Sequence, residues 1–221
     1  MKIHLGLIQE FIAGMMPDRA AIIAKDRVVT YGELAARSRR FARVLASRGL
    51  GCRTERAALK PWESGHDHVA IYLYNCPEYL EIMYGSYKAR AASVNINYRY
   101  KADELHYLLE NSGARAIVYH AAFASTLAEV RGRLPLLQHL FQIPDDSGAP
   151  LLPGAVAYET ALMAEPATVL DLPFSPDDLY VLYTGGTTGI PKGVLWRQED
   201  VFFNGLGGNL PGFERLDSED K

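Results

Sequence analysis

Short apolar runs alternate with segments of helical periodicity through the middle of this chain, and this alternation limits the possible folds more than any other feature. The apolar, β-forming runs occupy residues 68–74, 93–96, 115–120 and 137–143. The helical segments occupy residues 77–91, 102–111 and 122–131. Strands joined by helical crossovers of this length pair in parallel, and the helices then cover both faces of the sheet. We therefore predict an α/β fold with a mainly parallel sheet flanked by helices.

The N-terminal part predicts a helix, a hairpin and a second helix. An amphipathic segment reaches Met16, and residues 20–30 have the pattern of two short strands around a turn at residues 25–27. Thr30 stands three residues before Glu33, which is the spacing of a capping box at a helix start. The helix that follows has its apolar face at Leu34, Phe41, Ala42 and Leu45, and either Gly49 or Gly51 can end it.

Two segments lack periodicity. Residues 53–67 predict an exposed loop or insertion to which the sequence assigns no role. Residues 144–176 are rich in Pro, Gly, Asp and Ala and suit a connection between subdomains, with a brief helix near residues 157–164. We therefore expect an N-terminal α/β subdomain over residues 1–170 and the start of a second subdomain over residues 171–221.

The composition is that of a globular protein and not of a disordered, fibrous or membrane-spanning one. Of 221 residues, 48% are hydrophobic and 22% charged, and 23 basic against 26 acidic side chains leave a net charge of −3. This balance argues against nucleic acid as a partner. Two cysteines, Cys52 and Cys76, are too few for a disulfide framework. Because neither a signal peptide nor an apolar run of spanning length is found, we expect a cytoplasmic protein without a transmembrane segment.

The segment whose residue types indicate a function is residues 179–198, with the sequence LYVLYTGGTTGIPKGVLWRQ. Two apolar β-type runs flank a loop of glycine and threonine. The glycines let the backbone approach a ligand and aim successive N–H groups at it, the threonines add hydroxyl donors, and a lysine adds a mobile positive charge. Such a loop suits a polyphosphate. The residues concerned are Thr184, Gly185, Gly186, Thr187, Thr188, Gly189 and Lys192.

A plain hairpin turn, a Walker A motif and a dinucleotide-binding motif each fit this loop less well. A plain turn needs neither three threonines nor a lysine behind the rigid Pro191. The loop is not a Walker A motif, because Lys192 lies between Pro191 and Gly193. It is also not a dinucleotide-binding GxGxxG motif, because its glycines lie between two strands and do not open a helix.

Residues 181–192, VLYTGGTTGIPK, fit the phosphate-binding signature of the AMP-forming acyl-CoA synthetases at every defined position, and the chain resembles this adenylate-forming superfamily. The ending KGVLWRQED at residues 192–200 resembles the fatty-acyl-CoA synthetase branch. Three upstream segments support the resemblance: TYGELAARSRRFARVLASRGL at 30–50, AIYLYNCPEYLEIMYGSYKARAASVNINYRY at 70–100 and ADELHYLLENSGARAIVYH at 102–120. The resemblance thus covers essentially the whole chain.

The resemblance implies a ligase reaction in two steps. A carboxylate attacks the α-phosphate of ATP to give acyl-AMP and pyrophosphate, and CoA then displaces AMP. The resemblance implies that residues 184–189 wrap the β- and γ-phosphates and that Lys192 helps to neutralise them. ATP, Mg²⁺ and CoA are the implied cofactors, and a fatty acid or another carboxylic acid is the implied substrate. No catalytic residue and no metal ligand is identified in the sequence.

Two departures from the family pattern shape the prediction. Family members are more than twice as long, and a Tyr-Gly-x-Thr-Glu segment, a Thr-Gly-Asp segment and a C-terminal catalytic lysine have no counterpart here. We therefore expect an N-terminal portion of a fatty-acid–CoA ligase that is inactive by itself. The partners considered are the missing C-terminal portion and a second copy of the chain, as a homo-oligomer. The alternative is a catalytically silent remnant that binds a partner or has no function. In addition, Arg197 and Gln198 stand where many relatives have Thr-His.

Two weaker patterns involve possible ligand or acid–base groups. His66 and His68 flank Asp67 and could bind a metal with a third ligand, but a solvated loop explains them as well. Asp177 and Asp178 form a carboxylate pair directly after a Ser-Pro dipeptide, where turn and capping chemistry accounts for them. We therefore predict neither a metal site nor a catalytic carboxylate here.

Cysteine and tyrosine patterns are also better explained by packing. Cys76 precedes a proline at a helix start, where a thiol of lowered pKa is one interpretation and buried packing is the favoured one. Tyrosines cluster in one stretch and suit strands and half-buried helices better than a base-binding or acyl-binding site. They are Tyr72, Tyr74, Tyr79, Tyr84, Tyr87, Tyr98, Tyr100 and Tyr107.

Overall fold

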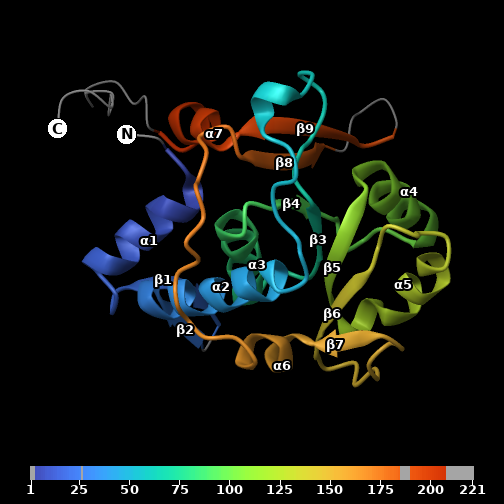
Figure 1. The fold of residues 1–221 in the computed structure, drawn as a ribbon. Coiled ribbons are helices and arrows are strands. Elements are labelled where there is room, and N and C mark those ends of the chain that lie inside the picture. The colour runs from blue at the N-terminus through green and yellow to red at the C-terminus, as the bar shows by residue number, and fades with distance from the viewer. Residues whose placement is uncertain (1–2, 26, 185–189, 208–221) are drawn as a thin grey trace.

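The computed structural model describes residues 3–25, 27–184 and 190–207, which form a seven-stranded sheet with helices around it (Figure 1). The strand order across the sheet is β7-β6-β5-β3-β4-β8-β9. Neighbouring strands from β7 to β8 are parallel, and β9 runs antiparallel to β8. The strands are β3 (His68–Tyr72), β4 (Ala92–Asn95), β5 (Ala114–His120), β6 (His139–Ile143), β7 (Ala155–Ala157), β8 (Leu179–Thr184) and β9 (Lys192–Arg197). The predicted mainly parallel α/β fold is confirmed.

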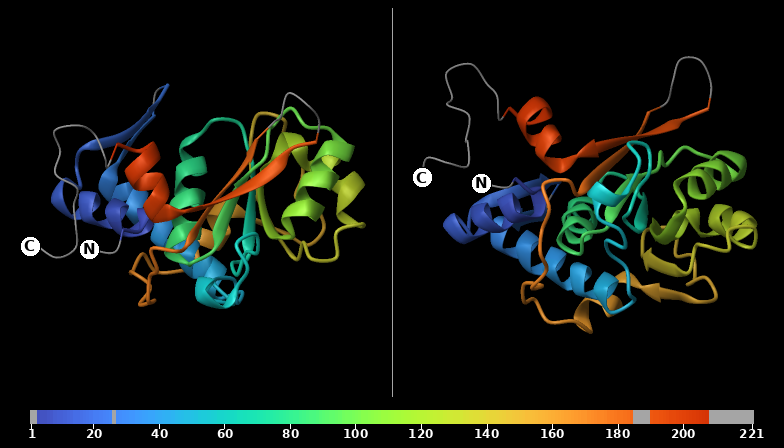
Figure 2. Two further views of the ribbon diagram at one scale, coloured as in Figure 1. Left: turned by 90° about the horizontal axis from the view of Figure 1, so that it is seen from above. Right: turned by 45° about the horizontal axis from the view of Figure 1, so that its top comes forward.

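Helices pack on both faces of this sheet, and Figure 2 shows them from two further directions. One face is covered by α2 (Tyr31–Ala46), α3 (Pro77–Lys88) and α6 (Tyr158–Met163), and the other by α4 (Ala102–Ser112) and α5 (Ala124–Arg131). Helix α1 (Leu5–Met15) packs on α2 and α3. The remaining elements are the hairpin of β1 (Ala20–Ala24) and β2 (Arg27–Thr30), the short 3-10 turns η1 (Arg56–Ala58) and η2 (Ala121–Phe123), and helix α7 (Gln198–Gly205).

The central strand β3 explains why both faces need cover. All of its residues are buried, and successive side chains of a strand point to opposite faces. Val69 and Ile71 belong to the core under α2, α3 and α6, whereas Ala70 and Tyr72 belong to the core under α4 and α5. The continuous apolar run of the sequence therefore reflects burial on both sides of a parallel sheet.

Local signals place several helix ends as predicted. Glu33 N donates to Thr30 Oγ1 at 3.1 Å, and Thr30 N donates to Glu33 Oε2 at 2.8 Å, which confirms the capping box at the start of α2. Gly49, and not Gly51, takes the left-handed conformation after this helix, with φ of 68°. Gly113 ends α4 in the same way, with φ of 60°.

The structure differs from the prediction at the end of α3 and in one strand that was not predicted. α3 ends at Lys88, short of residue 91, because the chain turns there through Arg90 with a positive φ of 55°. The three-residue strand β7 was not predicted within residues 144–176. It pairs with β6 at the edge of the sheet, and so short a strand carries no readable alternation.

Most of the 53–67 loop is exposed, as predicted, but its two arms meet. Cys52 and His66 form an isolated antiparallel bridge. Beside it, a Cβ atom on Gly65 would lie only 1.9 Å from the carbonyl oxygen of Thr54, so only glycine permits this approach. The loop ends at the buried Asp67, and it is therefore held against the body of the protein.

The β8–β9 hairpin lies in the same sheet as the preceding strands. β8 pairs with β4 through Val181 and Val94, and α7 behind the hairpin contacts α1. The division into subdomains at residue 170 stays a prediction. None of the described helices is both long enough and apolar enough to cross a membrane.

Candidate functional site

The β8–β9 hairpin carries the predicted phosphate-binding residues at its tip. Six residue pairs align its strands, from Leu179 opposite Arg197 at the base to Thr184 opposite Lys192 at the tip. Buried positions of β8 lie near its base, whereas β9 is largely exposed because it forms the edge of the sheet. Figure 2 shows the hairpin extending away from α1.

The tip brings together two of the predicted phosphate ligands. Directly opposite residues of an antiparallel pair point to the same side, so the exposed side chains of Thr184 and Lys192 share one face. Lys192 makes no ion pair with any residue that the structure describes. The other predicted ligands lie outside the described residues, and their role stays a prediction: Gly185, Gly186, Thr187, Thr188 and Gly189.

Helix α4 supports the outer half of the hairpin. Tyr107 donates its hydroxyl hydrogen to the carbonyl oxygen of Pro191 at 3.1 Å, and Tyr183 donates to Asn111 Oδ1 at 2.7 Å. Burial raises the pKa of Tyr183 to about 12, so its hydroxyl remains a donor. The Tyr183 ring lies over Gly193, where an added Cβ would come within 2.9 Å of it. The tip is therefore positioned by contacts outside its own ladder.

The base of the hairpin begins at Asp178, whose carboxylate is 1% exposed and contacts three cationic or ionisable groups. Arg90 Nη2 donates to Oδ1 at 2.8 Å, His66 Nε2 lies 3.0 Å from Oδ1, and His4 Nε2 lies 3.3 Å from Oδ2. Burial raises the pKa of Asp178, but hydrogen bonds from His4, His66 and Arg90 outweigh burial and hold this pKa well below its usual range. Asp178 is therefore a buried, ionised anchor.

The interpretation of Asp178 as only a turn and capping group is wrong. It does accept a hydrogen bond from Ser175 N at 3.4 Å, but its main partners come from distant segments. Arg90, for example, is 88 residues away in the sequence, and a local sequence pattern cannot predict a pairing over that separation. Asp177, in contrast, forms a half-exposed ion pair with Arg197.

Gln198 completes the base on the β9 side. Its side chain is fully buried, and Oε1 accepts a hydrogen bond from Leu5 N at 2.9 Å while Nε2 donates to Leu179 O at 3.4 Å. The amide thus ties the first turn of α1 to β8. Gln198, one of the two residues at which we expected a departure from the family pattern, thus has a structural role in this chain.

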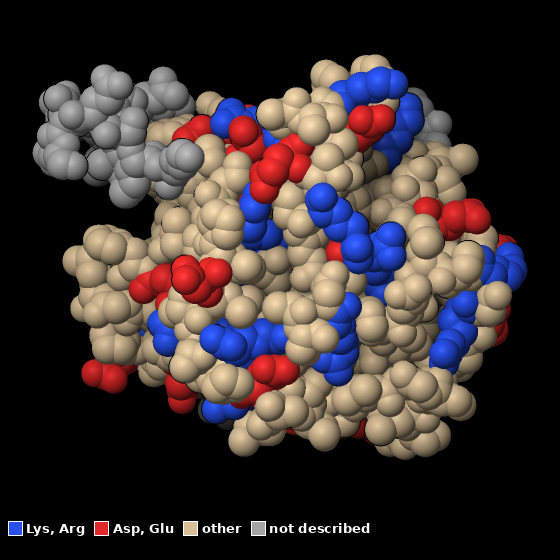
Figure 3. All heavy atoms as spheres, in the orientation of Figure 1, with Lys and Arg blue, Asp and Glu red and all other residues tan. Residues whose placement is uncertain are grey.

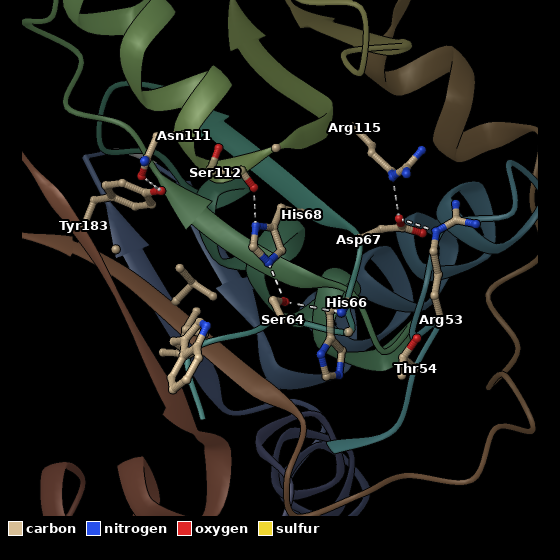
Figure 4. A pocket seen from close by; sticks show the side chains of 16 residues that line it. Arg53, Thr54, Ser64, His66, Asp67, His68, Asn111, Ser112, Arg115 and Tyr183 are labelled. Carbon is tan, nitrogen blue, oxygen red and sulfur yellow. Dashed lines mark hydrogen bonds and ion pairs between the residues drawn. The ribbon is translucent and has the colours of Figure 1, made fainter. Parts of the chain in front are cut away.

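A cleft of about 520 Å³ opens beside the hairpin (Figure 4). The 53–67 loop, the start of β3, the C-terminal end of α4 and the two hairpin strands line it. Arg53 Nε and Arg115 Nε donate to the same oxygen of Asp67 at 2.6 and 2.8 Å, so two cations share one buried carboxylate. On the face shown in Figure 3, basic and acidic side chains are interspersed.

The two histidines of the His-x-His pattern do not form one metal site. His68 is hydrogen-bonded within the cleft, whereas His66 faces Asp178. Cys52, His66 and Asp178 do bring ligand atoms within 4.8 Å of one another. Arg90, however, already donates to both oxygens of Asp178, and its positive charge disfavours a second cation there.

Packing explains the cysteine and two of the clustered tyrosines. Burial raises the pKa of Cys76 to about 12, with Glu78 adding to the effect, so the interpretation as a low-pKa thiol is wrong. Tyr72 and Tyr87 are buried in the core, and the Tyr72 hydroxyl donates to the carbonyl oxygen of Tyr100 at 2.7 Å. These tyrosines fill the core, which confirms packing for them.

A sequence profile described as AMP-binding enzyme matches residues 10–220. The chain belongs to the AMP-binding enzyme family. The match includes the hairpin and the cleft, and it confirms the resemblance that the loop sequence suggested. The mainly parallel sheet with helices on both faces is the fold that solved structures of adenylate-forming enzymes share with this AMP-binding chain.

Three known proteins illustrate the similarity. The medium-chain acyl-CoA ligase Mig of Mycobacterium avium is 51% identical over 201 residues, which cover 91% of this chain and 36% of that protein. The 3-oxocholest-4-en-26-oate--CoA ligase of Rhodococcus rhodochrous is 35% identical over 212 residues, which cover 95% and 36%. The crystal structure of the N-terminal domain of FACL13 from Mycobacterium tuberculosis has a TM-score of 0.73 and 26% identity, covering 91% and 46%. This AMP-binding enzyme chain thus spans about 36% of the length of the two ligases.

Proposed function

We propose that this chain carries the ATP phosphate-binding part of an AMP-forming acyl-CoA ligase. The proposed reaction activates a fatty acid or another carboxylic acid with ATP to acyl-AMP and then transfers the acyl group to CoA. The observation that carries the proposal is the hairpin register, which sets Thr184 opposite Lys192 at the two ends of a Gly- and Thr-rich loop. Family membership and the 51% identity to an acyl-CoA ligase support it.

The chemistry of the tip suits a polyphosphate. The ammonium group of Lys192 is a compact, mobile charge, and no acidic residue among those described pairs with it. Negative charge grows on the departing pyrophosphate during adenylation, and a cation placed there stabilises the transition state. The contacts of Pro191 and Tyr183 with α4 hold the tip before a ligand arrives, which reduces the ordering cost of binding.

The other components of the reaction are proposed from the family alone. Mg²⁺ and CoA are expected cofactors, and neither is assigned to a described residue. A medium-chain fatty acid is the first acid to test, because the 51% identical relative is named a medium-chain acyl-CoA ligase. The groups that bind adenine, ribose and carboxylate are proposed to come from a complementary C-terminal portion, and we propose a cytoplasmic location for the assembled enzyme.

Binding of Mg-ATP and of pyrophosphate to the purified 221-residue chain, measured by isothermal titration calorimetry, tests the phosphate site. We expect Lys192→Ala to weaken binding by about tenfold or more, because a hydrogen bond to a charged group contributes about 1.5–3 kcal/mol. Lys25→Ala removes an exposed lysine from the β1–β2 turn and is the matched control. Equal dissociation constants for wild type and Lys192→Ala contradict the proposal.

Fatty-acid-dependent release of pyrophosphate tests the activity of the chain by itself. We expect background release, because no described residue is placed to bring a carboxylate to the α-phosphate, and removing one such stabilising contact costs a factor of about 100 to 1000. Release that Lys192→Ala abolishes contradicts this expectation, since the chain then assembles a complete site.

A further inference from the structure

The cleft beside the hairpin holds a serine and a histidine in the arrangement of a nucleophile and its base. Ser64 Oγ lies 2.7 Å from His68 Nε2, and the other ring nitrogen, Nδ1, lies 2.6 Å from the carbonyl oxygen of Ser112 (Figure 4). Ser64 belongs to the 53–67 loop, His68 begins β3, and Ser112 ends α4. The imidazole ring is therefore held between the 53–67 loop and the end of α4.

The hydrogen bonds decide which atom carries each proton. A carbonyl oxygen can only accept, so Nδ1 of His68 must donate to Ser112. Burial lowers the pKa of His68, which keeps the ring neutral and leaves a lone pair on Nε2. The Ser64 hydroxyl therefore donates to Nε2, and His68 is oriented to take that proton. The backbone N–H of His66 also donates to Ser64 Oγ at 3.3 Å and helps to position the oxygen.

The cleft gives a ligand access to this pair. Both side chains line it, Ser64 half-buried and His68 buried, and its volume of about 520 Å³ is typical of small-molecule sites. Val181 and Leu195 of the hairpin provide an apolar wall. A largely exposed Trp62 stands at the loop side, which adds apolar surface where an acyl chain can lie.

Charge in the cleft favours an acyl donor with an anionic leaving portion. Arg53 and Arg115 bring two positive charges to the single carboxylate of Asp67. One positive charge thus remains uncompensated within this trio. A phosphate-bearing thioester or a polarised ester would be attracted to it, whereas a cationic ligand would be repelled.

We propose that Ser64, with His68 as its general base, is a nucleophile that accepts an acyl group from a carboxylic ester or thioester bound in this cleft. Ser64 Oγ bonds to the acyl carbonyl carbon while its proton moves to His68 Nε2. The C–O or C–S bond of the donor breaks, and His68 returns the proton to the leaving alcohol or thiol. In a slower step, water attacks the acyl-serine ester with the same base, which releases the carboxylic acid and restores Ser64, so the acyl-serine accumulates first. The reaction needs no nucleotide and goes beyond the proposed ligase function.

Covalent labelling of the 221-residue chain without ATP tests the proposal. The ester arm uses p-nitrophenyl butyrate and the thioester arm uses butyryl-CoA, with intact-mass measurement followed by peptide mapping. We expect one butyryl group per chain, located on Ser64, in at least one arm, and the arm that labels faster identifies the donor class. Absence of a Ser64 adduct in both arms, or labelling spread over several residues, overturns the proposal.

Variants separate nucleophilic chemistry from a structural hydrogen bond. Ser64→Ala should abolish the adduct, and His68→Gln should slow its formation by about 100-fold or more, because general base catalysis contributes factors of that size. Ser64→Cys keeps a nucleophile at the same position and should restore acylation, which a structural role does not predict. Ser147→Ala, in an exposed loop, is the control serine.

Thermal unfolding of each variant checks that it folds. A Ser64→Ala protein that folds and is acylated at the wild-type rate contradicts the proposal, and so does a folded Ser64→Cys protein that is not acylated. Lys25→Ala, at an exposed lysine outside both sites, should leave the labelling unchanged. The labelling is measured without ATP, so failure of the serine site is distinct from failure of the ATP site.

Discussion

The two ends of the β8–β9 hairpin differ in almost every physical respect. At the base, Asp178 and Gln198 are buried and hydrogen-bonded to Arg90 and Leu5, which come from distant parts of the chain. At the tip, Thr184 and Lys192 are exposed, and Ile190 is 65% exposed. One ladder of six residue pairs connects these ends.

The difference shows how stability and function divide along one element. Side chains at the base lose solvent and gain partners, so changing them disturbs the fold. Side chains at the tip keep solvent and have few partners, so changing them alters what the hairpin can bind. A hairpin anchored at its base can present a polar tip without the tip contributing to stability. Four substitutions, ordered by the size of their expected effect, test this division.

Asp178→Asn should have the largest effect on stability. Removing the carboxylate charge leaves Arg90 without the partner on its buried side, and breaking a buried ion pair in this way costs about 3–5 kcal/mol. Urea unfolding followed by circular dichroism measures the loss. Asp177→Asn, at the neighbouring half-exposed ion pair, is the matched control and should cost about 1 kcal/mol or less. Equal losses in the two variants would show that the base is not anchored by Asp178.

Gln198→Ala should cost less, about 1–3 kcal/mol. The substitution leaves the buried N–H of Leu5 without its acceptor, and an unsatisfied buried donor carries a penalty of that size. Unfolding in urea again measures it, with the exposed Gln138→Ala as control, expected within about 0.5 kcal/mol of wild type. A Gln198→Ala protein as stable as the control would remove Gln198 from the anchor.

Gly193→Ala probes the middle of the hairpin, and we expect a loss of about 1 kcal/mol. The new Cβ would lie 2.9 Å from the Tyr183 ring, and relieving this contact moves the ring away from Asn111. A double-mutant cycle with Tyr183→Ala measures the coupling. The cost should disappear in the Tyr183→Ala background, and a cost that persists there contradicts the steric explanation.

Lys192→Ala should have the smallest effect on stability, within about 0.5 kcal/mol, because the side chain is exposed and makes no ion pair among the described residues. The same variant should have a clear effect on ATP binding. Urea unfolding and calorimetry on one protein preparation measure both quantities. A large loss of stability would show that the tip also supports the fold.

Local sequence patterns predicted most of the fold correctly. The alternation of apolar runs and helical segments predicted the parallel sheet. The Thr30–Glu33 spacing predicted a helix start, and the pair Gly49 and Gly51 predicted the end of the same helix, which the structure places at Gly49. Each of these signals involves residues close together in the chain, whose interactions need little tertiary context.

The candidate site was only partly predictable. The glycine and threonine pattern identified the hairpin tip, and the register then placed Thr184 opposite Lys192. Asp178 was assigned to a turn, since its partner Arg90 is remote in the sequence. The pairing of Ser64 with His68 was also missed, because a four-residue separation within an irregular loop does not indicate contact.

The sequence by itself determined the class of fold, the family and the segment that we propose as the phosphate-binding loop. Those properties follow from periodicity and from a contiguous motif. Both signals involve residues that are close together in the sequence, so they can be recognised without the tertiary structure. Only the tertiary structure decided that Asp178 is an ionised anchor and that Ser64 donates to His68 within a cleft. The charge and reactivity of such groups depend on burial and on neighbours brought together by folding, and neither is a property of the residue alone.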